Sequence, residues 1–439
     1  MQLKHAPRFR RGRLARRLAQ AAGALLGGTA GAHAAEWRFD TALLYYSEAD
    51  GRVSAAEPVV RASRVDEEGG RELNFKLVLD SLTGATPTGA LPSSRPQTFS
   101  RPSGNGRYTV EAGAVPLDDT FHDTRWQLSG DWLEPLGRLD RVRLGLNLSN
   151  EYDFDSVGAS AAWERDFNQR NTTLLLGLAF EADSIDPVGG VPEALQDVLP
   201  DPENDPAGPE ARRARLDARP ASASRDQLDL LVGVTQLLDP ESFVQVNLSL
   251  SRSDGDHDDP YKMVSLVRTE AGPDQGEPVR NVYENRPDTR AKSALFLRYK
   301  RAFGRDVLDA SYRYYRDDWG VVAHTIELRY DFTFASGAFL QPHLRLYRQQ
   351  AADFYTSWLP VEATLPEYAS ADYRLGELSG TTIGVKYALP LDDRHTLEFR
   401  LERYVQSNDP VPGPPPGTPE GRRLILDTEA TLFQVRYTF

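Results

Sequence analysis

The stretch SDGDHDDPYK, at residues 253–262, carries carboxylates at every second position. Asp254, Asp256 and Asp258 alternate along it, and Gly255 lies between the first two. Closely spaced carboxylates beside a glycine can wrap a calcium ion, because calcium takes oxygen ligands in a flexible geometry. No bidentate glutamate follows at the distance that a full calcium loop requires, so an ordinary acidic outer loop is the other interpretation.

The remaining chemistry-bearing residues do not form a catalytic constellation. No His-Glu-x-x-His pair, Gly-x-Ser-x-Gly elbow or phosphate-binding glycine loop is present. The chain has no cysteine, which excludes thiol catalysis and cysteine-based metal sites. His343 falls on a predicted inward strand face, where a solvated histidine is the plainer interpretation. The sequence therefore predicts that the protein is not an enzyme and has no cofactor other than the calcium considered above.

Charged residues also recur in the middle of segments whose opposite face is apolar. In AHTIELRYDF, Ile326 and Leu328 alternate with Glu327 and Arg329. Successive side chains of a strand point to opposite faces, so this period of two predicts a two-faced strand. The same pattern repeats along the chain, and no helical periodicity of useful length competes with it.

Two architectures contain two-faced strands, a soluble sandwich and a transmembrane barrel. Mid-strand charges suit a wet lumen, and the segments are longer than is usual in soluble sheets. The connections alternate between short turns and the long stretches 81–120, 183–225, 254–290, 350–378 and 406–423. We therefore predict an all-β fold: a single transmembrane antiparallel up-and-down β-barrel over residues 35–439, with short periplasmic turns and long extracellular loops.

Sixteen strands are expected, or fourteen if the first hairpin is lost. The predicted strands are 37–48, 52–62, 71–80, 121–133, 141–151, 155–165, 171–182, 226–238, 243–253, 291–302, 306–316, 321–333, 338–349, 379–389, 395–405 and 424–439.

Residues 1–34 have the order of a secretory signal peptide. A basic segment without acids precedes an uncharged segment rich in Ala, Leu and Gly, and Ala-His-Ala ends it, which predicts cleavage before Ala35. A disordered basic arm is the alternative. Cleavage leaves 44 basic and 64 acidic residues, a net charge of −20. So acidic a chain is a poor match for nucleic acid, whose phosphates attract Lys and Arg.

The last strand, TLFQVRYTF, is apolar on one face. Phe433, Val435, Tyr437 and Phe439 share that face. We expect it to contact outer-membrane lipid, with its aromatic residues near the periplasmic interface. The stretch also resembles the carboxy-terminal signal of outer-membrane proteins, which ends in Phe and is recognised by the barrel assembly machinery. That machinery is therefore an expected partner, and the bacterial outer membrane the expected location.

The inward faces of the predicted strands carry charges of both signs. Those considered for a charged constriction that selects solutes are Arg143, Glu327, Arg329, Arg345 and Arg400. The alternative is that these side chains pair across the lumen and solvate it.

Several phrases of the mature chain resemble one bacterial family. They are LLYYSE (43–48), DSLTGATPTGA (80–90), SNEYDFDSVGASAAW (149–163), DPYK (259–262), YENRPDTR (283–290), AADFY (351–355) and SADYRLG (370–376). The chain is similar to the family catalogued as domain of unknown function 3570, with Thr86 and Thr88 where Ser and Asn would be expected. The resemblance implies an outer-membrane barrel and brings no established activity or catalytic residues.

Most of these phrases fall at predicted extracellular strand ends or loops, so we expect any ligand recognition there. The candidate residues are Asp80, Thr83, Asp259, Tyr261, Lys262, Tyr283, Glu284, Asn285 and Arg286. The alternative is that these segments fold inward and tie the loops together, since loops packed by their own side chains are common. The Pro-rich, charged stretch 201–220 is expected to be a mobile exposed loop.

The sequence thus favours a pore for small solutes. A non-conducting barrel that serves as scaffold or sheath for a periplasmic or surface protein is the second hypothesis, and an outer-membrane enzyme the third.

Overall fold

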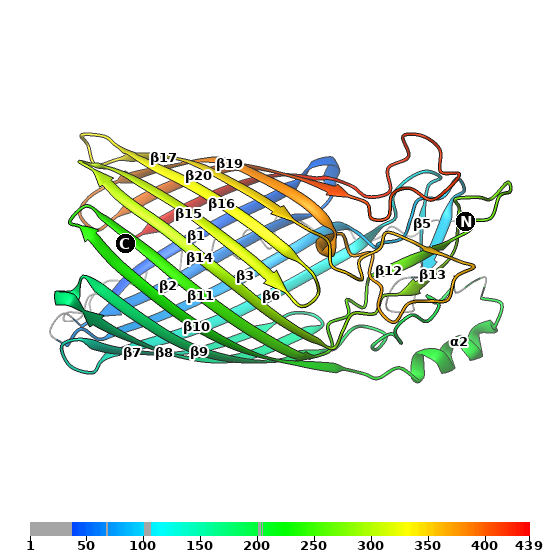
Figure 1. The fold of residues 1–439 in the computed structure, drawn as a ribbon, viewed down its shortest axis with the longest axis horizontal. Coiled ribbons are helices and arrows are strands. Elements are labelled where there is room, and N and C mark those ends of the chain that lie inside the picture. The colour runs from blue at the N-terminus through cyan, green and yellow to red at the C-terminus, as the bar shows by residue number, and fades with distance from the viewer. Residues whose placement is uncertain (1–36, 67–68, 101–106, 201–202, 204) are drawn as a thin grey trace, which may run out of the picture.

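The computed structural model describes residues 37–66, 69–100, 107–200, 203 and 205–439, so the signal peptide predicted at 1–34 lies outside the described residues. Within them, sixteen antiparallel strands close into one barrel (Figure 1). The order follows the chain, and the last strand pairs with the first. The predicted fold class and the count of sixteen are confirmed, and the alternative of fourteen is wrong because the first hairpin belongs to the wall.

Each predicted strand has a counterpart in the wall. The barrel strands are β1 (Trp37–Glu48), β2 (Ser54–Val65), β3 (Glu72–Pro87), β6 (Leu117–Pro135), β7 (Asp140–Asn150), β8 (Phe154–Phe167), β9 (Thr172–Ile185), β10 (Ala223–Asp239), β11 (Ser242–Gly255), β14 (Thr289–Phe303), β15 (Asp306–Asp317), β16 (Val322–Thr333), β17 (Phe339–Gln349), β19 (Glu377–Pro390), β20 (Thr396–Asp409) and β21 (Thr428–Thr438).

The cross-strand register assigns the two faces of the wall. Residues paired across neighbouring strands point to the same side of a sheet. Glu327 on β16 is opposite Arg345 on β17, and both lie on the inner side. Ile326 and Leu328 alternate with Glu327 and are exposed on the outer side. An apolar exterior around a polar interior is the arrangement of a barrel that crosses lipid.

The two ends of the barrel differ in the length of their connections. At the end that also holds the carboxy terminus, adjacent strands are joined by short turns, and β14 and β15 are joined by Gly304 and Arg305 alone (Figure 1). Gly304 has a φ of 64°, a value that a tight two-residue turn needs and that glycine adopts without strain. We call this the turn end.

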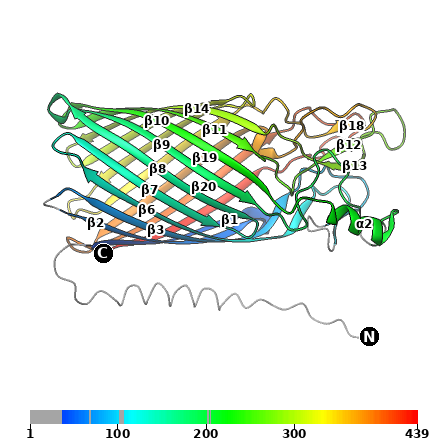
Figure 2. The same ribbon diagram turned by 90° about the horizontal axis from the view of Figure 1, so that it is seen from below.

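At the other end, the described residues of the segments 88–116, 186–222, 256–288, 350–376 and 410–427 fold into a packed layer that we call the cap (Figure 2). It contains β4 (Gln97–Ser100), β5 (Arg107–Val110), β12 (Met263–Val267), β13 (Pro278–Tyr283), β18 (Leu359–Pro360) and α2 (Gly208–Asp217). Val264, Leu266 and Val282 are fully buried in its core.

The expectation that 201–220 is a loop is wrong for residues 208–217, which form a helix, although most of that helix is exposed. Helix α2 occupies Gly208–Asp217, with a proline in its first turn, and Arg212 is buried. The Arg212 guanidinium donates to the carbonyl of Pro200 at 2.5 Å and to the hydroxyl of Ser100 at 2.7 Å. These partners hold the helix on the cap, which composition alone does not reveal. No helix among the described residues is long and apolar enough to cross a membrane.

Candidate functional site

A buried group of acidic and basic side chains lies within the cap. We call Asp259, Glu284, Arg286, Asp372 and Arg374 the cap cluster. The Arg286 guanidinium lies 2.7 Å from a carboxylate oxygen of Glu284 and 2.9 Å from one of Asp372. Glu284 and Asp372 are each only 1% exposed. Two carboxylates so far from water need the cation between them, because an unpaired buried charge is strongly unfavourable.

Arg374 forms the remaining ion pairs of the cap cluster, with Asp259 and Asp372. Its Nε atom donates to both carboxylate oxygens of Asp372, at 2.9 and 2.8 Å, and its terminal nitrogen lies 2.5 Å from Asp259. The backbone N–H of Asp259 donates to Glu284 at 2.6 Å, and the hydroxyl of Ser370 donates to the other oxygen of Glu284 at 2.5 Å. The cluster therefore joins the segments 256–288 and 350–376, which are remote in sequence.

The carboxyl groups of the cap cluster differ in their affinity for protons. Burial raises the pKa of Glu284 to about 8, and the nearby carboxylates of Asp259 and Asp372 act in the same direction. Burial also disfavours the charged form of Asp372, but Arg374 and Lys262 outweigh it and hold the pKa of Asp372 below its usual range. Glu284 is thus the carboxyl group of the cluster that titrates near neutral pH.

Two further mouth residues of the sequence prediction anchor the cap to the barrel rim. Lys262 is buried and its ammonium group donates to the carbonyl of Pro87 at 2.5 Å, at the end of β3. The hydroxyl of Tyr261 donates to Asp153, in the short connection between β7 and β8. Both side chains therefore bind the cap to the wall.

Tyr283 and Asn285 face away from the cap cluster. Arg219 lies over the Tyr283 ring, 5.1 Å from its centre, and donates to its hydroxyl at 2.9 Å. Asn285 pairs through its backbone with Ala369 and donates from its side chain to the carbonyl of Glu367 at 2.5 Å. These contacts connect 256–288 with 186–222 and 350–376.

Asp80 and Thr83 are separate from the other predicted mouth residues. Both belong to β3, where Asp80 accepts from Arg125 Nε at 2.5 Å and Thr83 lies 3.2 Å from the Ser54 hydroxyl. The structure thus brings together Asp259, Glu284 and Arg286, and leaves Asp80 and Thr83 on the barrel wall.

Sequence reasoning missed Asp372 and Arg374, which take part in three of the four ion pairs of the cap cluster. Their signal in the sequence is the phrase SADYRLG at 370–376, which carries part of the family resemblance.

Within the lumen, His343 bridges two carboxylates. Its Nε2 atom lies 2.8 Å from Glu327, and its Nδ1 atom lies 2.9 Å from Glu402. Arg329 also pairs with Glu327. Gly384 lies between His343 and Glu402 in the register, and a Cβ atom there would come within 2.5 Å of the Glu402 side chain. The absence of a side chain at Gly384 lets Glu402 reach across β19.

The other predicted lumen residues differ in their partners. Arg143 lies 3.1 Å from Glu72 and also pairs with Asp131. Arg400 lies 3.9 Å from Glu402, at the limit of an ion pair. Arg345 lies over the ring of Tyr347 at 5.7 Å and has no ion-pair partner among the described residues.

The three candidate calcium ligands do not converge. Asp254 belongs to β11 and pairs with Arg252 at 3.0 Å. Asp256 accepts from the backbone N–H of Asp258 at 2.8 Å, and Asp258 accepts from that of Arg286 at 2.6 Å. Over the described ranges, no group of three or more His, Asp or Glu side chains is arranged to hold a metal ion.

A serine–histidine pair that the sequence did not signal lies at the start of the cap. The Ser253 hydroxyl is 2.7 Å from His257 Nε2, and His257 Nδ1 is 2.8 Å from the carbonyl of Gly255. Nδ1 therefore donates to the carbonyl, and Nε2 accepts from the hydroxyl. Ser253 and His257 are both buried, and the histidine packs edge-on against Trp319. Because both side chains are buried, the pair supports the loop.

The residues predicted as an assembly signal lie on the outer face of the closing strand, β21. Phe433 is exposed, and Val435 and Tyr437 alternate with inward residues. The Phe439 ring stacks on Tyr437 at 5.3 Å and on Phe39 at 5.5 Å, across the seam between β21 and β1.

Comparison with known proteins gives one family and several distant structural likenesses. The family described as Protein of unknown function (DUF3570) matches residues 15–439. No curated protein matches. A mutant of the ferric enterobactin receptor PfeA from Pseudomonas aeruginosa has a TM-score of 0.40 at 10% identity, over 86% of this chain and 54% of its own.

The outer membrane protein opdK from Pseudomonas aeruginosa has a TM-score of 0.38 at 11% identity, over 93% of this chain and all of its own. CdiB from Acinetobacter baumannii has a TM-score of 0.42 at 7% identity, over 92% of this chain and 60% of its own. The chain therefore spans little more than half the length of PfeA and of CdiB. With TM-scores this low, these likenesses add nothing to the topology described above.

Proposed function

The chain belongs to the family described as Protein of unknown function (DUF3570), and from its geometry we propose that it is an outer-membrane pore for small hydrophilic solutes. The signal peptide, cleavage before Ala35 and assembly by the barrel assembly machinery are parts of the same proposal. The apolar exterior contacts lipid, and the short turns lie on the periplasmic side, as in bacterial outer-membrane barrels. The cap then lies on the extracellular side.

One observation carries the proposal: charged side chains on the inner face remain in contact with solvent. The side chains of Arg329, Arg400 and Arg436 are 38%, 42% and 40% exposed although all three point into the closed barrel. A packed interior excludes water from such groups. Their exposure indicates a hydrated lumen, which is the property that a diffusion pore needs.

The conductance of the purified protein in planar lipid bilayers tests the proposal. We expect stable open steps that become smaller in Ser249→Trp, because Ser249 is a small residue on the inner wall. Leu248→Trp is the matched control, since Leu248 is exposed on the outer face of the same strand. A silent wild-type barrel, or equal conductance in both variants, would contradict a pore.

The scaffold hypothesis has one observation in its favour, which is the packed cap. Because the cap has its own buried core, it would serve in this case as a docking platform for a protein partner and not as a gate. A silent barrel that co-purifies with a single surface or periplasmic protein would support this role.

We also propose that the protein is not an enzyme and does not bind nucleic acid. The ring nitrogens of His257 and His343 are already occupied by structural partners. The net charge of −20 after cleavage opposes binding to phosphates. Hydrolysis of lipid or peptide by the purified barrel would contradict the first statement.

A further inference from the structure

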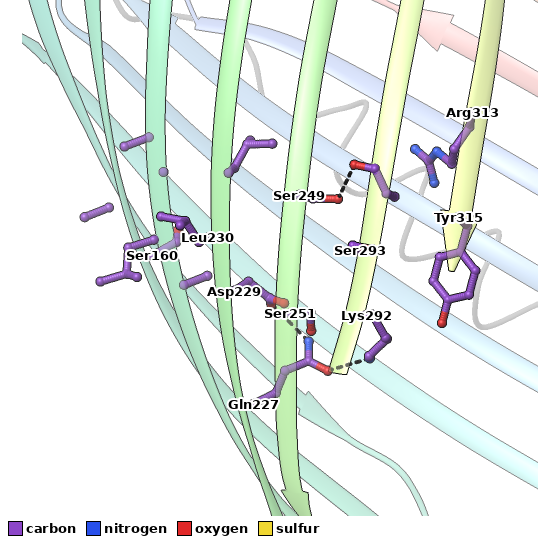
Figure 3. Close-up of a pocket in the computed structure, with 17 residues that line it drawn as sticks. Ser160, Gln227, Asp229, Leu230, Ser249, Ser251, Lys292, Ser293, Arg313 and Tyr315 are labelled. Atoms are coloured by element: carbon purple, nitrogen blue, oxygen red, sulfur yellow. Dashed lines mark hydrogen bonds between the residues drawn. The ribbon is translucent and has the colours of Figure 1, made fainter. Parts of the chain in front are cut away.

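A cavity of about 510 Å³ lies against the inner wall along β8–β11, β14 and β15 (Figure 3). Ser160, Ala162, Gly177 and Ala179 line one side of it. Because these side chains are small, the lumen is wide at this level. The volume falls within the range of about 300–1,000 Å³ that is typical of small-molecule sites.

Two cations from neighbouring strands border this cavity. Arg313 belongs to β15 and Lys292 to β14, and the ring of Tyr315 borders the cavity with them (Figure 3). The register places Arg313 opposite Phe296 and Lys292 opposite Asp317. The two positive charges therefore lie at different heights along the same part of the barrel wall.

Neither cation is neutralised by an ion pair within the described part of the chain. The Arg313 guanidinium lies over the Phe296 ring at 5.6 Å. The Lys292 ammonium donates to Gln227 at 3.0 Å, and Gln227 donates in turn to Asp229 at 3.0 Å. Asp229 is the one carboxylate that lines the cavity, so the lining has a surplus of positive charge.

Other arginines of the lumen form ion pairs with carboxylates, which is the ordinary arrangement. Arg298, on the strand of Lys292, donates to Asp309 at 2.8 Å, and Arg143 pairs with Glu72 and Asp131. Arg313 and Lys292 differ from these residues because they border an open cavity and form no ion pair with a described carboxylate. The hydroxyl of Ser251, in the same lining, is buried and has no hydrogen-bond partner among the residues that the structure describes. A buried polar group is normally satisfied, so an unmet hydroxyl at a cavity points to a missing partner.

We propose that this cavity is a binding subsite for small carboxylate solutes on their way through the lumen. The inference rests on the proposed pore function and names its substrate class. Arg313 binds the carboxylate through its planar fork of donors, which fits two carboxylate oxygens. Lys292 adds a second positive charge, and Ser251 offers a hydroxyl donor. The Tyr315 ring, whose hydroxyl donates to Asp317 at 2.8 Å, forms a fixed wall for the carbon skeleton.

Titration calorimetry on the detergent-solubilised full barrel tests the subsite with succinate as the probe. We expect binding of succinate and no measurable binding of its uncharged analogue succinamide. Arg313→Gln and Lys292→Gln should each weaken succinate binding about tenfold or more, since each removes a charge-assisted contact. Lys386→Gln is the matched control, because Lys386 also lacks an ion pair in the described lumen, lies over the Phe339 ring and is outside the cavity. It should bind succinate as the wild type does.

Absence of succinate binding, equal affinity for succinamide, or unchanged affinity in both variants would overturn the subsite. Binding of inorganic phosphate in place of succinate would overturn the assignment to carboxylates. The electrophoretic shift on heating, which reports a folded barrel, excludes misassembly of the variants. Since calorimetry needs no conductance, a silent barrel that binds succinate would refute the pore and keep the subsite.

Discussion

Arg286 is the cation that two buried carboxylates of the cap share. Replacing it with Met leaves Glu284 and Asp372 in a dry environment without that guanidinium. Removing one partner of a buried ion pair costs about 3–5 kcal/mol. We expect the free energy of cap opening to fall by about this amount in Arg286→Met, measured by hydrogen exchange of residues 256–288, while the barrel strands keep their protection.

The matched control for Arg286→Met is Arg280→Met. Arg280 also pairs with an aspartate of the cap, Asp197, but both side chains are largely exposed. Exposed ion pairs contribute about 0–1 kcal/mol, so this variant should exchange nearly as the wild type. Equal effects of the two substitutions would show that burial of the cap cluster has no energetic consequence.

His257 makes cap stability depend on pH. Burial lowers the pKa of His257 to about 4, and the positive charges of Arg225, Arg290 and Lys292 act in the same direction. The imidazole is thus neutral in the folded cap and binds a proton more readily when the loop opens. Its contribution is complete above about pH 6.5 and is lost as the pH falls toward 4, by up to about 3 kcal/mol. Hydrogen exchange of 256–288 at pH 7 and pH 4.5 measures this loss.

Asp258 also changes its contribution to cap stability between these two pH values. Burial raises the pKa of Asp258 to about 7, so its contribution is largest at low pH and declines as the pH rises. The two residues therefore have opposite signs. The difference between wild type and His257→Gln isolates the histidine, and the prediction is wrong if the variant loses as much protection at pH 4.5 as the wild type.

At the scale of elements, the seam between β1 and β21 closes the barrel. Phe439 stacks on Phe39 and Tyr437 there, and its backbone exchanges two hydrogen bonds with Phe39, at 2.7 and 2.9 Å. Phe439→Asp removes both ring contacts, each worth about 0.5–1.5 kcal/mol beyond burial, and adds a charge to an apolar face. We expect the assembled fraction to fall several-fold, measured by the electrophoretic shift of the barrel on heating. Leu391→Asp, in an exposed turn, should assemble normally.

The strands of the wall were predictable because each has one wet and one apolar face. This alternation is local, so the positions of all sixteen can be read from the sequence. Strand β12 of the cap lacks it: its sequence, MVSLV, is buried on both sides. In a strand that is buried on both sides, apolar and polar residues do not alternate, so its sequence lacks the period of two. For this reason the sequence predicts only long loops where the cap forms.

The cap cluster could be predicted only in part, for a different physical reason. Arg286 and Asp372 are 86 positions apart, and Asp259 and Arg374 are 115 apart. Side chains that meet over such separations are placed by the packing of whole segments. The sequence could therefore suggest Asp259, Glu284 and Arg286 as mouth residues, but not Asp372 and Arg374, which pair with them.

At the scale of the whole molecule, the packed cap lies at one end of a barrel with a polar interior, and this position raises the question of whether the cap limits the passage of solutes. The hairpin of β12 and β13 supplies Val264, Leu266 and Val282 to the cap core. Met263 and Tyr283 face each other directly at its base. Residues 264–282 can therefore be replaced by Asn-Gly, a favoured two-residue hairpin turn, without pulling the ends apart.

If the cap limits passage, this shortened protein should conduct more than the wild type and admit larger uncharged sugars in liposome swelling. The reason is that loss of the hairpin removes the hydrophobic core that holds the cap over the lumen. The pairing of the barrel strands is unchanged, because none of them is shortened. Unchanged heat modifiability would establish that the wall still assembles. Equal conductance and equal size exclusion would show that the narrowest point lies below the cap, at the level of His343 and its carboxylate partners. In that case Gly384→Val, which intrudes on Glu402, should change conductance where removal of the hairpin does not.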